Sequence, residues 1–283
     1  MQDTDTIKSQ LTNIGDSMQV IDQRDSKVYW ISKLADGNIW MTQNLDLDLD
    51  STKTYTPADT DVSANWTPIN STIIFSGTSV SGWGNSNKAP YSANPGSIFY
   101  YGSDGTGDDF QYTSLADCQA AHPDCSMRNH TGNYYNWSAA VATNNTSSAT
   151  MQYENMATSI CPAGWRLPTG RQSDSTSLEG NELGTILDTY SILGDYHDCG
   201  GTCFYHDYAE GGFGKIHTVP LWLSRSGFIN SGSLDDAASQ GFYWSSTVYS
   251  GSGAFGLHFN SNIVYPAYDH YKGDGFSVRC LVD

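Results

Sequence analysis

The sequence predicts an α+β fold in which two helices pack on a small antiparallel sheet. Short runs rich in β-branched and aromatic residues recur along the 283 residues, and Gly, Asn, Asp or Ser bound most of them, which is typical of strands joined by turns. Two stretches with helical character interrupt these runs. Together these elements indicate an α+β domain.

The first expected elements form a β-meander. Residues 19–22 and 27–31 are β-rich runs on either side of the polar turn 24–26, which predicts a hairpin. A second turn at 35–38 leads into the short run 39–41. Three antiparallel strands should therefore open the fold.

Residues 45–50 alternate Leu and Asp with a period of two. This pattern predicts a strand or an extended segment with leucines facing inward and carboxylates facing outward. The three carboxylates also raise the alternative of a calcium site.

A long insertion should follow, over about residues 51–131. Its composition is rich in Ser, Thr, Asn, Gly and Pro with scattered aromatic residues, which indicates an insertion pinned by aromatics rather than a separate domain. Within it, Asp104 and Asp108 lie on a Gly-rich turn that offers oxygen ligands. The turn lacks the Glu that closes an EF-hand loop, so weak calcium binding and a plain surface turn both stay open.

Two helices are expected in the second half of the chain. Residues 136–143 form a short alanine-rich stretch, and the stripe Leu183, Ile186, Leu187 and Tyr190 recurs at helical spacing. Residues 176–179 would supply a capping box for the second helix.

Short strands should then lead to the end of the chain, at 242–246, 254–259 and 275–280. The whole of 19–283 is expected to be one domain, with residues 1–18 as a polar leader.

Charge and composition exclude several classes of protein. The chain has 13 Lys and Arg against 30 Asp and Glu, so its net charge is −17, which argues against binding to nucleic acid. Aromatic residues make up 13%, enough to build a core, which argues against disorder. No apolar run approaches the roughly 20 residues that span a bilayer, so we expect no membrane insertion by this segment.

The six cysteines indicate disulfides and therefore an oxidising, extracellular location. They fall as two short-range pairs and two lone residues: Cys118 with Cys125, Cys199 with Cys203, and Cys161 and Cys280. A zinc site built from His197, Cys199, Cys203 and His206 is an alternative, although this spacing does not match the usual zinc-finger patterns.

Four segments resemble the Fibrobacter succinogenes major paralogous domain family. They are 33–45 (KLADGNIWMTQNL), 160–169 (ICPAGWRLPT), 243–247 (YWSST) and 275–280 (GFSVRC). The resemblance implies a C-type-lectin-like fold, related to that of formylglycine-generating enzymes. It also implies secretion or display at the cell surface, behind an N-terminal anchor that this chain would lack.

The chain departs from this family in three places. They are the 51–131 insertion, the loop between Cys199 and Cys203, and Ile39, where many relatives carry Cys. The resemblance nevertheless implies a bridge from Cys161 to Cys280. This bridge would close a loop of about 120 residues, which stabilises a fold by about 4 to 5 kcal/mol in the chain-entropy model. Two buried free thiols are the alternative.

Residues 244–280 divide into a framework and a set of interrupting positions. The framework consists of Trp244, Ser245, Ser246, Thr247, Ala254, Leu257, Phe259, Val264, Pro266, Gly275, Phe276, Val278 and Arg279. The interrupting positions, which we predict to form a variable ligand-binding face, are Tyr249, Ser250, Ser252, Phe255, Gly256, His258, Asn260, Ser261, Asn262, Tyr265, Tyr268, Asp269, His270, Tyr271 and Asp274.

Most residues at these positions can be reached by substituting the adenines of AAC or AAT codons. The segment therefore resembles the variable region of a target protein of a diversity-generating retroelement, in which error-prone reverse transcription rewrites adenines. Tyr, Ser, Gly, Asn and His are also the residues that antibody-like binding sites favour. An ordinary polar sheet surface with turn residues is the alternative.

The sequence thus predicts a surface-displayed, non-catalytic protein that binds a protein or glycan ligand on another cell or a virus. We expect no catalytic residues and, calcium aside, no cofactor. A structural pilus or adhesion subunit is one alternative, and an oxidase like the formylglycine-generating enzymes is another. No catalytic pair supports the oxidase, and fold analogy alone is weak support for a function.

Overall fold

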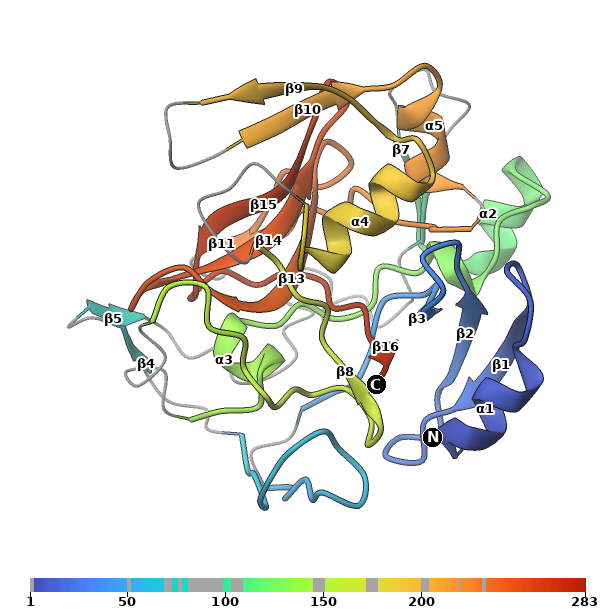
Figure 1. Ribbon diagram of the computed structural model, residues 1–283. Helices are drawn as coiled ribbons and strands as arrows, with labels where there is room; N and C mark the ends of the chain where they lie inside the picture. The colour runs from blue at the N-terminus through green and yellow to red at the C-terminus, as the bar shows by residue number, and fades with distance from the viewer. Residues whose placement is uncertain are drawn as a thin grey trace.

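A computed structural model shows a mixed α and β chain whose strands pair antiparallel (Figure 1). The α+β prediction is confirmed at the level of fold class. The structure describes residues 3–49, 52–68, 73–75, 78–80, 99–102, 109–144, 151–171, 178–199, 204–218, 220–230 and 233–283.

The first sheet has the order β1-β2-β3-β16-β8 and joins the two ends of the described chain. Its strands are β1 (Ser17–Ile21), β2 (Val28–Lys33), β3 (Ile39–Met41), β16 (Leu281–Val282) and β8 (Trp165–Arg166). The predicted meander is confirmed, with Met18 opposite Ile31 and Ile31 opposite Met41. Strand β16 then pairs with both β3 and β8.

The second sheet has the order β13-β14-β15-β10-β9. Its strands are β13 (Gly241–Val248), β14 (Gly253–Phe259), β15 (Ile263–Tyr271), β10 (Phe204–Tyr208) and β9 (Leu193–Asp198). The predicted strands 242–246 and 254–259 are confirmed. Strand β15 was not expected, because Pro266 and polar residues interrupt its pattern. Figure 1 shows the β9–β10 hairpin at the end of the molecule opposite the termini.

The prediction of a strand at 275–280 is wrong. Residues 275–277 make only isolated bridges, from Gly275 to Ile229, Phe276 to Tyr135 and Ser277 to Tyr243. The segment threads between three elements, so it has no continuous strand partner, and regular pairing begins at β16.

Three further hairpins complete the described strands. They are β4 (Ile73–Phe75) with β5 (Thr78–Val80), β6 (Phe99–Gly102) with β7 (Asp109–Tyr112), and β11 (Phe228–Asn230) with β12 (Ser233–Asp235). The first two belong to the predicted insertion. Asp104 and Asp108, the calcium candidates, lie outside the described residues.

The expectation of two helices is too low. The helices are α1 (Thr4–Gln10), α2 (Leu115–Ala121), the 3-10 turn η2 (Met127–Asn129), α3 (Trp137–Ala140), α4 (Glu182–Thr189) and α5 (Gly212–His217). The two predicted helices are α3 and α4. The additional ones have seven residues or fewer, too few to show a clear apolar stripe.

Asparagine caps both predicted helices. The backbone N–H of Ala139 donates to Asn136 Oδ1 at 2.8 Å, and that of Gly184 donates to Asn181 Oδ1 at 2.8 Å. Helix α4 therefore begins after Asn181 and not at the expected capping box, of which Thr176 and Ser177 lie outside the described residues. In the part of the chain that the structure covers, no helix is both long and apolar enough to cross a bilayer.

The segment predicted as a polar leader contributes to the core. Ile7 of α1 is fully buried and Leu11 is 3% exposed. Both belong to the main apolar cluster. Asp3 caps the helix by accepting from the N–H of Thr6. These residues therefore pack with the domain and do not merely precede it.

The predicted alternation is confirmed for the leucines and for Asp48, whose side chain is 59% exposed, whereas Asp50 lies outside the described residues. Leu45, Leu47 and Leu49 are buried in an extended segment that pairs with no strand. Asp46 is also buried, contrary to the prediction, because its carboxylate forms an ion pair with Lys27 Nζ at 2.9 Å. The lysine ammonium supplies the positive charge between these carboxylates.

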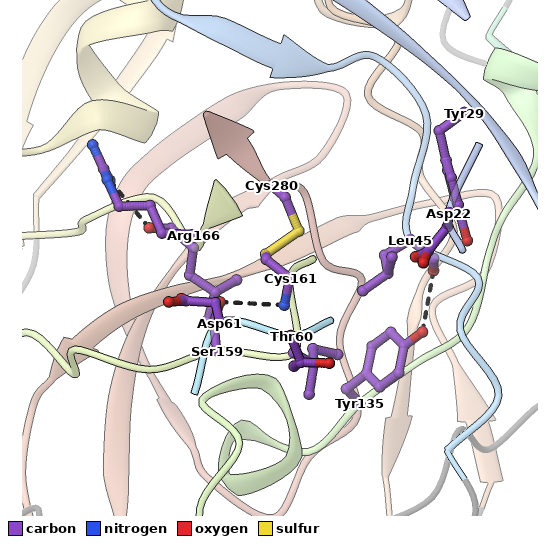
Figure 2. The surroundings of a disulfide bond; sticks show 12 residues. Asp22, Tyr29, Leu45, Thr60, Asp61, Tyr135, Ser159, Cys161, Arg166 and Cys280 are labelled. Carbon is purple, nitrogen blue, oxygen red and sulfur yellow. Dashed lines mark hydrogen bonds between the residues drawn. A yellow bond between two sulfur atoms is a disulfide. The ribbon is translucent and has the colours of Figure 1, made fainter. Parts of the chain in front are cut away.

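Two disulfides are present among the described residues. Cys118 bonds to Cys125, and Cys161 bonds to Cys280 with a Cα to Cα distance of 5.8 Å, so the alternative of buried free thiols is wrong. Figure 2 shows the second bridge beside Ser159, whose Oγ accepts from the Cys161 N–H at 3.2 Å. Cys203, the expected partner of Cys199, lies outside the described residues. Disulfides are typical of oxidising, extracellular compartments.

Candidate ligand-binding face

The thirteen framework positions of the C-terminal segment are all buried. Strand β13 is buried along its whole length: it contacts helix α3, and its residues belong to both main apolar clusters. Trp244 donates its indole N–H to the Tyr135 carbonyl at 2.7 Å. Arg279 donates to Asn44 Oδ1 and to the carbonyls of Met41, Leu221 and Trp222. These contacts tie the segment to the first sheet.

Thirteen of the fifteen interrupting positions are partly or fully exposed. The two exceptions are Phe255 and Gly256. The Phe255 ring is enclosed by the rings of Tyr153, stacked at 5.8 Å, and Tyr249, edge-on at 5.3 Å. A Cβ on Gly256 would lie 2.8 Å from the Tyr243 carbonyl oxygen. Both residues therefore support the surface from below.

A single row of aromatic and imidazole rings crosses all five strands of the second sheet. Phe242 of β13 stacks on His258 of β14 at 4.4 Å, and His258 stacks on Tyr265 of β15 at 5.2 Å. Tyr265 then meets Tyr205 of β10 at 5.5 Å, and Tyr205 stacks on His197 of β9 at 4.8 Å. The register places these residues opposite one another, so the row follows from strand pairing.

Tyr268 and His270 lie beside this row on the same face. Tyr268 is 4.9 Å from Tyr265 and 5.1 Å from His270, measured between ring centroids. His270 in turn packs edge-on against Phe276 at 4.8 Å. The face is therefore a continuous surface of rings, built partly from the predicted positions.

The other predicted positions lie at the ends or on the back of the sheet. Residues 249–252 form the turn between β13 and β14, and residues 260–262 form the turn between β14 and β15. Asp269 and Tyr271 alternate with His270 along β15 and so point to the opposite face. Asp274 follows β15, where burial and then the charge of Asp235 raise its pKa to about 7.

Lys272 supports the first of these turns from beneath. Its side chain is buried, Nζ donates to the Ser250 carbonyl at 2.8 Å, and the ammonium lies 4.4 Å from the Trp137 ring centroid. Burial lowers its pKa to about 8. Sequence reasoning missed this residue, although it is the sole lysine after Lys215 and thus stands out in a polar segment.

The two histidines of the face are held in their neutral form. Burial lowers the pKa of His258 to about 4, and burial followed by the charge of His258 lowers that of His270 well below its usual value. His258 Nε2 hydrogen bonds to Gln240 Oε1. Among the described residues, His258 Nδ1 and His270 Nε2 have no hydrogen-bond partner. Both unpartnered nitrogens are buried, so the histidines contribute uncharged rings to the face.

His197 and His206, the two histidines of the alternative zinc site, lie on opposite sides of the β9–β10 hairpin. His197 hydrogen bonds to Asp207 at 2.9 Å, whereas His206 Nδ1 faces the Gly194 carbonyl at 3.1 Å. Within the described ranges no three metal-binding side chains come together. His197, Tyr205 and Phe242 were not predicted as part of the face, because two lie far upstream and strand order alone brings them to Tyr265.

Comparisons of the chain with protein-family models, with curated proteins and with solved structures return no match.

Proposed function

We propose that this chain is a surface-displayed, non-catalytic ligand-binding protein with a C-type-lectin-like fold. Its C-terminal face is diversified by a retroelement and recognises protein or glycan ligands on another cell or a virus. The observation that carries the proposal is the burial pattern of residues 244–280. Framework positions are buried without exception, whereas nearly all interrupting positions reach solvent.

This division is what a diversified surface requires. Substitutions at exposed positions usually change the free energy of unfolding by less than about 0.5 kcal/mol, whereas substitutions in a core cost several times more. A process that rewrote only the interrupting codons would therefore leave the fold intact and change the binding surface. An ordinary sheet with one solvated face also places its polar residues outward, so the two libraries described below distinguish a dedicated binding face from such a sheet.

A disulfide and several hydrogen bonds connect the framework beneath the face to the rest of the domain. The Cys161–Cys280 bridge, which the family resemblance implies, fixes the end of the segment, and Arg279 links it to the first sheet. Variable residues on a rigid framework are the usual arrangement of binding loops. The mixed fold with antiparallel sheets agrees with a lectin-like architecture at the level of class.

Two matched libraries test the proposal. One varies Tyr265, Tyr268, Ser261 and Asn262 on the face, and the other varies four exposed residues around helix α4: Glu179, Thr185, Asp188 and Thr189. Both are displayed and selected against purified lysozyme. We expect binders from the face library and none from the α4 library, with both libraries folded as judged by protease resistance. Equal yields from the two libraries would contradict a dedicated binding face.

A further inference from the structure

We propose that the β9–β10 hairpin forms a second, constant half of this face, and that the combined surface binds a polypeptide through its arginine or lysine side chains. The inference rests on the proposed function and adds the chemical class of the partner. It concerns His197, Tyr205 and Asp207, none of which belongs to the predicted variable segment.

The geometry of the ring row supports the extension. The two ends of the row differ in exposure: Phe242 is 4% exposed, whereas the His197 side chain is 39% exposed. Tyr265 and Tyr205 lie in the accessible middle, with one ring from each half of the face. A ligand that contacts Tyr265 would therefore also meet Tyr205.

The distribution of charge selects a cationic partner. The five strands of this sheet contain no lysine or arginine. On the ring-bearing face, Asp195 lies two residues before His197 and so shares its side of β9, and Asp207 contacts His197. On the hairpin, the Asp207 side chain is 52% exposed and contacts His197, and no described lysine or arginine forms an ion pair with it. An anionic ligand would meet uncompensated negative charge here.

Neighbouring tyrosine rings beside a carboxylate suit a guanidinium or an ammonium. Cations bind over tyrosine rings, and arginine also stacks on them while donating hydrogen bonds to a carboxylate. His258 and His270 are neutral, so they add no repulsion. A glycan would also stack on the tyrosines, but it would gain little from the aspartate charge.

The two halves would then have different roles. Asp207, Tyr205 and His197 would fix the preference for a basic side chain, while Tyr265, Tyr268 and the adjoining turn would select its surroundings. A diversified face with a constant cationic preference would search a restricted class of protein surfaces.

Site-resolved NMR titration of the full chain tests this inference. The probes are acetyl-triarginine amide, acetyl-triglutamine amide, acetyl-triglutamate amide and maltotriose. We expect triarginine alone to shift resonances of Tyr205, His197 and Tyr265. Asp207→Asn should weaken its binding about fivefold, whereas Asp188→Asn, which removes the same charge from an exposed site on α4, should change it less than twofold.

Two results would overturn the inference. One is that maltotriose or an uncharged or acidic peptide shifts Tyr265 and Tyr268 and leaves Tyr205 and His197 unchanged. That outcome would retain the variable face as a binding site and remove both the hairpin and the cationic partner. The other is equal weakening of triarginine binding by Asp207→Asn and Asp188→Asn, or no site-specific shift at all. The selection with lysozyme decides the proposed function separately.

Discussion

The two five-stranded sheets differ in their charged residues. Around the first sheet, cations are paired: Arg24 with Asp22 at 2.6 Å, Lys27 with Asp46, and Arg166 of β8 with Glu182 at 2.7 Å. The strands of the second sheet contain no cation, and rings line one of its faces. The comparison teaches that ion pairs stabilise the surroundings of the first sheet, since buried charges need partners, whereas contacts between rings connect the strands of the second.

The largest expected effect concerns the Cys161–Cys280 bridge, which lies beside the neighbouring strands β8 and β16 of the first sheet. Replacing both Cys161 and Cys280 with Ala should lower the free energy of unfolding by about 5 kcal/mol, because the closed loop spans 119 residues. The matched pair Cys118→Ala and Cys125→Ala opens a loop of 7 residues and should cost only about 2 kcal/mol. Denaturant unfolding measures both. Equal losses would show that loop length does not govern the contribution of the bridge.

The next effect concerns Arg279, the buried cation that ties the segment after β15 to the first sheet. Its burial lowers its pKa to about 10, and its replacement by Met would leave buried carbonyl groups without donors. We expect a loss of about 3 kcal/mol. Arg166→Met, which removes a half-exposed ion pair, should cost about 1 kcal/mol. If the two variants unfolded at the same denaturant concentration, Arg279 would not be the link between the sheets.

A smaller effect should appear on acidification. The pKa of His258 is lowered to about 4 in the folded chain, whereas unfolding restores a value near 6.5. Between these two pH values the unfolded state therefore binds more protons than the folded state. The contribution of His258 to the free energy of unfolding is complete above about pH 6.5 and is lost as the pH falls toward 4. His258→Gln should lose less stability than the natural chain between pH 7 and pH 4.5.

The raised pKa of Asp274 acts in the opposite direction. Its contribution is present at low pH and is lost as the pH rises from about 4 to about 7. Denaturant unfolding of the natural chain and of His258→Gln is measured at pH 7 and at pH 4.5. Because both proteins contain Asp274, its contribution cancels in the difference between them. Parallel curves for the two proteins would mean that His258 titrates normally.

The smallest expected effect is that of a substitution on the face, which we compare with a substitution at a buried framework position. Tyr268→Ser should change the free energy of unfolding by less than about 1 kcal/mol, because its ring is partly exposed and packs against the neighbouring rings of Tyr265 and His270. Trp244→Ser should cost more than about 3 kcal/mol, since Trp244 is fully buried and stacks on Phe276 at 4.1 Å. Thermal unfolding compares them, and similar losses would erase the distinction between the two sets.

Local patterns predicted much of this fold. Turn residues located the β1–β2 hairpin, and helical spacing located α4. Residue type alone separated buried Trp244 and Val278 from exposed Tyr268. These features depend on neighbours in the chain.

Features that depend on strand order could not be predicted. Tyr205 lies 60 positions before Tyr265, and only the pairing of β10 with β15 makes them neighbours. The burial of Asp46 depends on Lys27, which a period-two pattern cannot reveal. Phe255 was assigned to the variable set by its position, but its ring is enclosed by Tyr153 and Tyr249, which come from two separate segments.

Deep sequencing of the codons for residues 240–283 across a natural population, with a search of neighbouring DNA for a template copy, tests the central claim most directly. We expect differences confined to template adenines, dense at exposed positions such as Tyr265 and Tyr268 and absent from the thirteen buried framework codons. An invariant segment without a template, or variation spread equally over buried and exposed codons, would contradict a diversified binding face on a constant scaffold.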